Sequence, residues 1–144
     1  MKLITNIDSL IADERVEIFA RKEYPEVIEI KKIIDGKPTE IIGFLPNGSF
    51  KLLNLQEVNC FTIIGGKLYA KSDNEKYEIK KRLYEIEGCL PKQFQKISQS
   101  CIVNLMRVIK FELFFNGSLA CKFADDSEYV SRRYIKNLKE RLGI

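Results

Sequence analysis

Short apolar runs separated by turn residues make up most of this sequence from residue 41 onward. Pro46-Asn47-Gly48, Gly65-Gly66 and Asn116-Gly117 each separate two runs rich in β-branched and aromatic residues. Glycine and asparagine accept the left-handed backbone of tight hairpin turns, so neighbouring runs are expected to pair antiparallel. The spacing therefore predicts a mainly β (α+β) domain built from antiparallel sheets with a few short helices.

Two segments in the same part of the chain have the period of an amphipathic helix. The first runs from about Lys81 to Leu90 and is stopped by Pro91, because the residue before a proline disfavours helical backbone. In the second, Tyr134 and Leu138 share one side of a C-terminal helix that Gly143 ends. Each helix is predicted to have one apolar side.

Residues 1–45 differ from the rest and are predicted to form an N-terminal extension. Residues 2–7 and 16–20 are strand-like. A helix is predicted from Pro25 to a stop at Gly36, with an apolar stripe at helical spacing formed by Val27, Ile30, Ile33 and Ile34. Because such a stripe needs an apolar partner, the extension is predicted to dock on the main domain or to form a dimer. The main domain then comprises residues 46–144.

The composition is typical of a soluble globular protein. The chain has 144 residues, of which 45% are hydrophobic and 31% are charged, so it is long enough to bury a core. No apolar run approaches the roughly 20 residues of a membrane-spanning helix. The N-terminus lacks the apolar region and cleavage site of a signal peptide, which predicts a cytoplasmic protein.

Charge is unevenly spread along the chain. Residues 91–144 carry 10 Lys and Arg against 5 Asp and Glu, whereas residues 1–50 carry 7 against 9. A basic C-terminal part that follows an acidic N-terminal part indicates a surface that binds a polyanion. Chance asymmetry on a solvated surface explains the charge pattern equally well.

The residue types that most catalytic sites need are missing. The chain has no histidine, and it has no G-x-x-x-x-G-K-[ST] loop for a nucleotide phosphate. We therefore predict no enzymatic activity, no cofactor and no small-molecule substrate. The four cysteines form no C-x-x-C pair, and Cys60, Cys101 and Cys121 lie in apolar runs. They are predicted to fill the core, with no metal site and no disulfide.

Two segments near the C-terminus carry a specific pattern. Residues 94–105 read FQKISQSCIVNL, a polar and basic start followed by an apolar strand, and residues 129–134 read YVSRRY. Together they resemble the signature of the LytTR family of bacterial DNA-binding domains, in which a loop of the form F-x-R-[IV]-[SH]-[KR]-S precedes a strand I-V-N and V-S-R-R-Y follows. The resemblance covers about residues 50–144. It implies an elongated stack of small antiparallel sheets that binds duplex DNA through loops placed in successive major grooves.

The resemblance also implies which residues face DNA. Three places correspond to DNA-facing loops: the turn before Lys67, the segment 96–100, and the junction at Arg132. An arginine fork suits guanine and a glutamine amide suits adenine, so Arg133 and Gln99 are the candidate base readers. The full set of predicted DNA-binding residues is Lys67, Lys96, Ser98, Gln99, Ser100, Ser131, Arg132 and Arg133, with Lys67 a weaker base reader and Lys96, Ser100, Ser131 and Arg132 on phosphates.

Structural roles compete with these assignments. Lys67 suits a solvated turn equally well, and Ser131 suits the N-cap of the last helix. Arg132 and Arg133 are within reach of surface ion pairs with Asp126 or Glu128. Two arginines in the first turn of a helix nevertheless oppose the helix dipole, and an anion bound there explains the placement. Asn104 is predicted to stabilise a turn.

The predicted function is a transcriptional regulator that binds double-stranded DNA sequence-specifically. The resemblance implies direct repeats rich in A and T, a possible homodimer, and a small membrane protein encoded nearby that restrains the regulator. Gln99 replaces the Lys or Arg usual in the family, so a target sequence does not transfer. One alternative is a protein-interaction module of the same fold with a weakened DNA face. Another is an RNA-binding β domain, although Phe61, Phe114 and Phe115 are predicted to lie in the core.

Overall fold

The computed structural model describes residues 19, 25, 27–30 and 40–144. The chain divides into two units, residues 1–38 and 39–144. In the first unit, residue 25 and residues 27–30 are helical and Val27 is buried, within the helix predicted there. The remainder of that helix lies outside the described residues. So do the strands predicted at 2–7 and 16–20, apart from the exposed Phe19.

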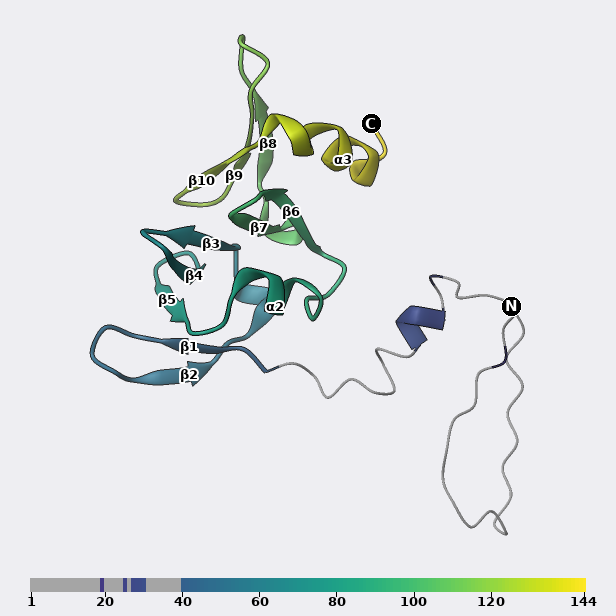
Figure 1. Ribbon diagram of the computed structural model, residues 1–144. Coiled ribbons are helices and arrows are strands. Elements are labelled where there is room, and N and C mark those ends of the chain that lie inside the picture. Colours follow the sequence, from purple (N-terminus) through teal and green to yellow (C-terminus); the bar gives the residue numbers. More distant parts are fainter. Residues whose placement is uncertain (1–18, 20–24, 26, 31–39) are drawn as a thin grey trace. The chain divides into compact units, whose positions relative to one another are not determined.

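Seven antiparallel strands of the second unit form the larger sheet, in the order β2-β1-β5-β4-β3-β7-β6 (Figure 1). The turns predicted at Gly48 and Gly65-Gly66 join β1 to β2 and β3 to β4, and these glycines have positive φ. The strands are β1 (Ile42–Phe44), β2 (Phe50–Leu52), β3 (Cys60–Ile64), β4 (Lys67–Lys71), β5 (Lys76–Ile79), β6 (Phe94–Ser98) and β7 (Cys101–Asn104).

Three more antiparallel strands form the smaller sheet, in the order β10-β9-β8. They are β8 (Lys110–Leu113), β9 (Leu119–Lys122) and β10 (Ser127–Val130). The predicted fold class, mainly β with short helices, is confirmed. In Figure 1 the β8–β9 hairpin projects away from the other strands. Phe115, at its tip, is fully exposed, so the prediction that Phe115 lies in the core is wrong, whereas Phe61 is fully buried.

The helices are short. Helix α2 (Leu83–Glu87) covers only part of the segment predicted as helical, because Gly88 follows as its C-cap and glycine weakens helix propagation. Helix α3 (Arg132–Leu142) begins two residues before Tyr134 and ends at Gly143, whose φ of 74° and N–H bond to the Glu140 carbonyl terminate it. In the described part of the chain, no helix is long and apolar enough to cross a membrane.

The larger sheet has an apolar cluster on each face. On one face Phe61 and Ile102 pack with Ile86 of α2. On the other face Cys60 and its neighbours pack against the smaller sheet and α3, through buried residues that include Leu138. Strands β3 and β7 can supply both clusters because successive side chains of a strand point to opposite faces.

Asparagine-capped 3₁₀ turns occur twice, fifty residues apart, in similar sequence. Asn54 caps η1 (Leu55–Glu57) and Asn104 caps η2 (Leu105–Arg107), each by accepting a hydrogen bond from the N–H two residues on. Asn104 is fully buried and also donates to the carbonyls of Leu55 and Val58, at 3.3 and 3.0 Å. It therefore stabilises a turn, as predicted, and joins the two capped turns together.

Candidate nucleic-acid interface

Two backbone hydrogen bonds bring the three predicted DNA-facing segments to one end of the larger sheet. The N–H of Ser131 donates to the carbonyl of Ile97 at 2.8 Å, which fixes the start of α3 beside β6. The N–H of Ile63 donates to the carbonyl of Ser100 at 2.9 Å, next to the β3–β4 turn. Segments far apart in sequence thus form one surface.

The turn between β6 and β7 presents Gln99 to solvent. The pairing register shifts between Lys96 and Ser98, because Ile97 is fully buried and takes the bulge position. Ser98 Oγ then accepts the N–H of Ser100 at 3.2 Å, which closes the turn. Gln99 and Ser100 remain exposed at its tip. The bulge and the hydrogen bond between Ser98 and Ser100 fix the backbone from which the Gln99 side chain extends.

The start of α3 carries two exposed arginines. Ser131 is the N-cap residue with extended backbone, as predicted, but within the described residues its hydroxyl makes no capping hydrogen bond. Arg132 and Arg133 are exposed, and in the described part of the chain no ion pair holds either of them. Guanidinium groups beside the N–H groups of a helix start form an anion-binding arrangement.

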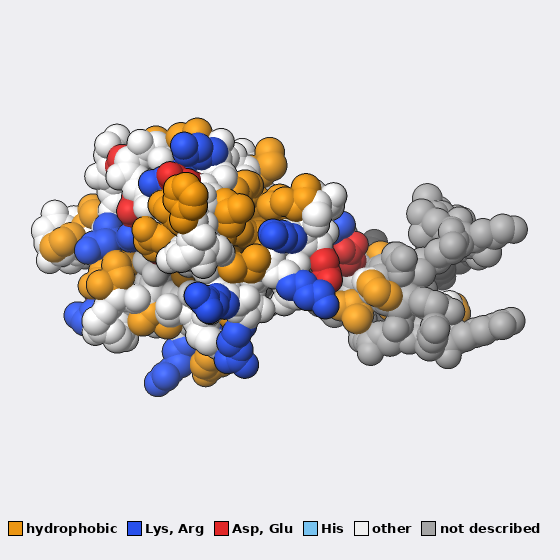
Figure 2. Space-filling view, turned by 90° about the horizontal axis from the view of Figure 1, so that it is seen from above, with side chains coloured by type: hydrophobic (Ala, Val, Ile, Leu, Met, Phe, Trp, Pro, Cys, Tyr) orange, Lys and Arg blue, Asp and Glu red, His pale blue; other side chains and the backbone are white. Residues whose placement is uncertain are grey.

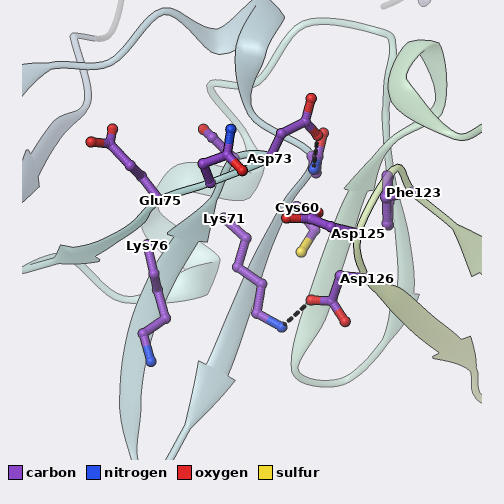
Figure 3. Close-up of a pocket in the computed structure, with 11 residues that line it drawn as sticks. Cys60, Lys71, Asp73, Glu75, Lys76, Phe123, Asp125 and Asp126 are labelled. Carbon is purple, nitrogen blue, oxygen red and sulfur yellow. Dashed lines mark hydrogen bonds and ion pairs between the residues drawn. The ribbon is translucent and has the colours of Figure 1, made fainter.

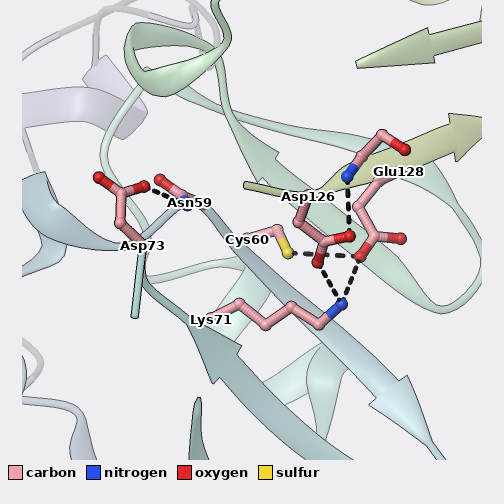
Figure 4. Close-up of polar contacts among 7 residues, drawn as sticks. Asn59, Cys60, Lys71, Asp73, Asp126 and Glu128 are labelled. Atoms are coloured by element: carbon pink, nitrogen blue, oxygen red, sulfur yellow. Dashed lines mark hydrogen bonds and ion pairs between the residues drawn. The ribbon is translucent and has the colours of Figure 1, made fainter. Parts of the chain in front are cut away.

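Asp126 and Glu128, the alternative partners predicted for these arginines, form ion pairs with Lys71 instead. Lys71 Nζ lies 2.8 Å from Asp126 Oδ2 and 3.0 Å from Glu128 Oε1 (Figure 4). Although burial lowers the pKa of Lys71, the hydrogen bonds to Asp126 and Glu128 raise it above its ordinary value overall. This ion group joins β4 of the larger sheet to the smaller sheet. The alternative that Arg132 and Arg133 pair with these acids is therefore wrong.

The two predicted lysines lie near acids. Lys67, at the first position of β4, is well exposed and its Nζ lies 3.8 Å from Glu78 Oε1. Lys96 is less exposed, and its Nζ lies 3.6 Å from Glu87 Oε2 at the end of α2. Long contacts between partly solvated charges are weak, so both lysines can exchange partners. The structure thus places Gln99 and Ser100 beside the start of α3. The Lys96 side chain extends toward the end of α2 instead.

A family model of the LytTr DNA-binding domain matches residues 48–143. The chain belongs to the LytTR family. It is 33% identical over 147 residues to proteins of Staphylococcus aureus strains MSSA476 and MW2 that are described as HTH-type transcriptional regulators, covering 100% of this chain and 99% of each relative. The solved LytTr DNA-binding domain of a Bacillus cereus response regulator matches with a TM-score of 0.67 at 18% identity, covering 74% of this chain and 99% of that chain. In this LytTR chain β6–β10 separate α2 from α3, so these two helices form no helix-turn-helix.

One basic residue was missed by the sequence analysis of this LytTR chain. Lys136 is exposed on α3, four residues after Arg132 and three after Arg133. Residues at these spacings share a helix face, so Lys136 extends the basic surface of the α3 start. The helical spacing after the VSRRY segment is the signal that could have found it. In the view of Figure 2, Lys and Arg side chains lie at several places among apolar ones, while acidic side chains are few.

A second polar group lies at the edge of the LytTR domain. Arg107 donates to Asp73 Oδ2 at 2.7 Å and to Asn59 Oδ1 at 3.0 Å, and Asn59 Nδ2 donates to Asp73 Oδ1 at 2.9 Å. The hydrogen bond from Asn59, with the Arg107 charge, holds the pKa of Asp73 below its ordinary value. The group borders a pocket of about 400 Å³ whose lining includes Cys60, Lys71 and Asp126 (Figure 3). Its internal pairing indicates a structural role that ties η2 to the sheet.

Proposed function

We propose that this protein is a transcriptional regulator that binds double-stranded DNA sequence-specifically through the β3–β4 turn, the β6–β7 turn and the start of α3. The observation that supports it most is the pair of backbone bonds at Ile97 and Ser100, which assemble the three segments. Arg132 and Arg133 are exposed there and unpaired among described residues. Phosphate contacts position a protein on DNA and a few side chains read base edges, and this surface offers both kinds.

Each segment has a role in the proposal. Arg133 reads guanine and Gln99 reads adenine, since their donor and acceptor patterns match those bases in the major groove. Hydroxyls and cations around them hold phosphates, and Lys67 approaches a neighbouring groove. The phosphate-holding set is Lys96, Ser98, Ser100, Ser131 and Arg132.

The family membership supports further proposals about assembly. We propose that the protein acts in the cytoplasm on direct repeats, with a homodimer as one way to occupy two sites. A small membrane protein that restrains it is the proposed regulatory partner. These proposals rest on the family resemblance of the FQKISQSCIVNL and VSRRY segments.

The deciding experiment measures binding of the full chain to labelled duplex by fluorescence anisotropy. One duplex carries the DNA upstream of the protein's own gene, and the other has the same composition in shuffled order. We expect tighter binding to the first, and loss of that binding when Arg132 and Arg133 are both changed to Ala. Lys139→Ala, a charge removal in the last turn of the same helix, is the matched control and should bind nearly as the parent. Equal binding of both duplexes, or none at low salt, would contradict the proposal.

A protein-interaction module of the same fold is the second candidate. The observation in its favour is that Lys67 and Lys96 lie near Glu78 and Glu87, which offsets part of the positive charge of the surface. Absence of duplex binding in the experiment above would favour this module. Tight, sequence-dependent binding of duplex would exclude the interaction module, because that module requires a weakened DNA face.

A further inference from the structure

Two cysteines and one glutamate converge where the larger sheet meets the smaller one. Cys60 of β3, Cys101 of β7 and Glu128 of β10 offer ligand atoms that all lie within 4.8 Å of one another. The cysteines are 1% and 3% exposed, and Cys60 Sγ lies 3.8 Å from Glu128 Oε1 (Figure 4). All four cysteines of the chain, which lie in its described part, are free thiols. Two soft sulfur donors and one hard oxygen donor thus lie close enough to bind one ion together.

The strand register argues against a disulfide between these cysteines. Cys60 pairs with Val103 and Thr62 pairs with Cys101, so the two cysteines are diagonal neighbours. Diagonal positions of an antiparallel pair lie about 7–8 Å apart, beyond the reach of a sulfur–sulfur bond without backbone movement. A shared ion spans a wider gap, because each metal–sulfur bond is about 2.3 Å long.

The charges of the neighbouring groups are compatible with the replacement of two thiol protons by one divalent cation. Lys71 contacts two carboxylates, Asp126 and Glu128, so these three groups together carry one negative charge. A divalent cation that displaces two thiol protons leaves the local charge unchanged, so no additional charge is buried.

A pocket borders one member of the cluster. Cys60 lines the pocket of about 400 Å³ together with Lys71, Phe123 and Asp126 (Figure 3). Exposed Asp125 and Asp126 stand at its border, and carboxylates there favour the approach of a cation.

Contrary to the sequence-based prediction of no metal site, we propose that Cys60, Cys101 and Glu128 form a binding site for a thiophilic divalent cation of the zinc class, with a water as fourth ligand. Thiolate donors select such ions over Mg²⁺ and Ca²⁺, which prefer oxygen. The ion ties β3 and β7 of the larger sheet to β10 of the smaller one. Cys101 directly follows the Gln99 turn and Glu128 lies three residues before Ser131, so the site joins two segments of the candidate interface.

The test titrates the reduced full-length protein with Cd²⁺, followed by its ultraviolet thiolate-to-metal charge-transfer band. We expect one ion per chain, displacement by Zn²⁺ but not by Mg²⁺, and release of about two protons per ion, so that affinity rises with pH. Loss of an outer-shell partner of a metal site typically weakens affinity about 10–100-fold. Cys60→Ser and Cys101→Ser, which remove ligands themselves, should therefore weaken binding at least about tenfold. Cys89→Ser, which removes the exposed thiol, should leave binding unchanged.

Two measurements keep the test decisive if a buried-cysteine variant folds poorly. Glu128→Gln keeps the side-chain shape and should weaken Cd²⁺ binding while the fold, followed by circular dichroism, persists. The parent protein should unfold at a higher temperature with Zn²⁺ than without it. No saturable band in the folded parent protein, or a band lost with Cys89→Ser but kept with Cys60→Ser and Cys101→Ser, would overturn the proposal. These readouts involve no DNA and stand independently of the proposed DNA binding.

Discussion

Arg133 is the residue on which base recognition is most sharply testable. It is exposed in the first turn of α3, where a cation opposes the helix dipole unless an anion compensates. The acids nearest in sequence are held by Lys71 instead. The side chain thus keeps its five donors for a ligand, which is what bidentate reading of guanine needs.

Changing Arg133 to Ala should therefore cost roughly 1–3 kcal/mol on the specific site and much less on random duplex. Preference should relax at one base pair, measured by anisotropy competition with single-base variants of the site. The matched control is Arg132→Ala, which should weaken both duplexes alike. If Arg133→Ala weakens both duplexes equally, the residue grips only the backbone.

Lys96 is expected to hold phosphate rather than to read a base. Lys96→Ala should weaken specific and random binding alike and reduce the slope of log K against log salt by about one. Glu87→Gln removes the acid 3.6 Å from Lys96 Nζ and should strengthen binding to both duplexes modestly. Measurements at four salt concentrations give the slopes. An unchanged slope in Lys96→Ala would remove this lysine from the interface.

At the level of elements, the asparagine-capped turns hold the strands of the two sheets in place. Asn104 ends β7 and begins η2, while its amide also holds the carbonyls at both ends of η1. The equivalent Asn54 is exposed and makes only the local cap. Asn104 should therefore contribute more to the free energy of unfolding than Asn54, because burial removes water as an alternative hydrogen-bond partner.

Asn104→Ala should destabilise the protein by about 2–4 kcal/mol, the sum of a lost cap and of the Val58 carbonyl left without its side-chain donor. The Leu55 carbonyl keeps the N–H of Val58 as a donor. Asn54→Ala should cost about 1 kcal/mol, the loss of a cap alone. Urea unfolding followed by circular dichroism gives both free energies. Similar losses in the two variants would show that the buried bonds of Asn104 contribute little.

For the whole molecule, DNA affinity should depend strongly on salt. If about four to six cations meet phosphates, log K should fall with log salt at a slope of about −4 to −5. The basic excess of residues 91–144 motivates this expectation. Anisotropy titrations at several salt concentrations measure the slope. Binding that does not change with salt would argue against a phosphate-contacting surface.

The N-terminal extension should affect the solubility or the assembly of the whole protein. The extension predicted as residues 1–45 includes β1 (Ile42–Phe44), which pairs with β2 and β5 of the larger sheet. A truncation should therefore remove only residues 1–38 and leave residues 39–144 intact. We propose that the extension covers apolar surface on the domain or on a second copy. Removing residues 1–38 should lower solubility or dissociate a dimer, checked by sedimentation and by thermal unfolding. A truncated chain with unchanged solubility, stability and oligomeric state would refute the proposal.

Local sequence determined the hairpins, the two helices and the family, because these depend on residues close in the chain. Glycine turns fix where strands reverse, and apolar spacing fixes which face is buried. Helix bounds were less predictable. The predicted helix from Lys81 ends early, because Gly88 and the packing of Ile86 decide its length together. Phe115 was misplaced, because apolar character alone does not tell a hairpin tip from a core position.

Contacts between distant segments were decided only by the tertiary structure. The bond from Ser131 to Ile97 assembles the candidate interface, and Lys71 captures Asp126 and Glu128 from another sheet. The approach of Cys60 to Cys101 and Glu128 likewise depends on strand register and sheet packing. Sequence spacing constrains such encounters weakly, because they are set by how the sheets stack to bury both faces of β3 and β7. Residue types therefore indicate which ligands suit the chain, whereas packing decides which groups stay exposed and which are held in internal pairs.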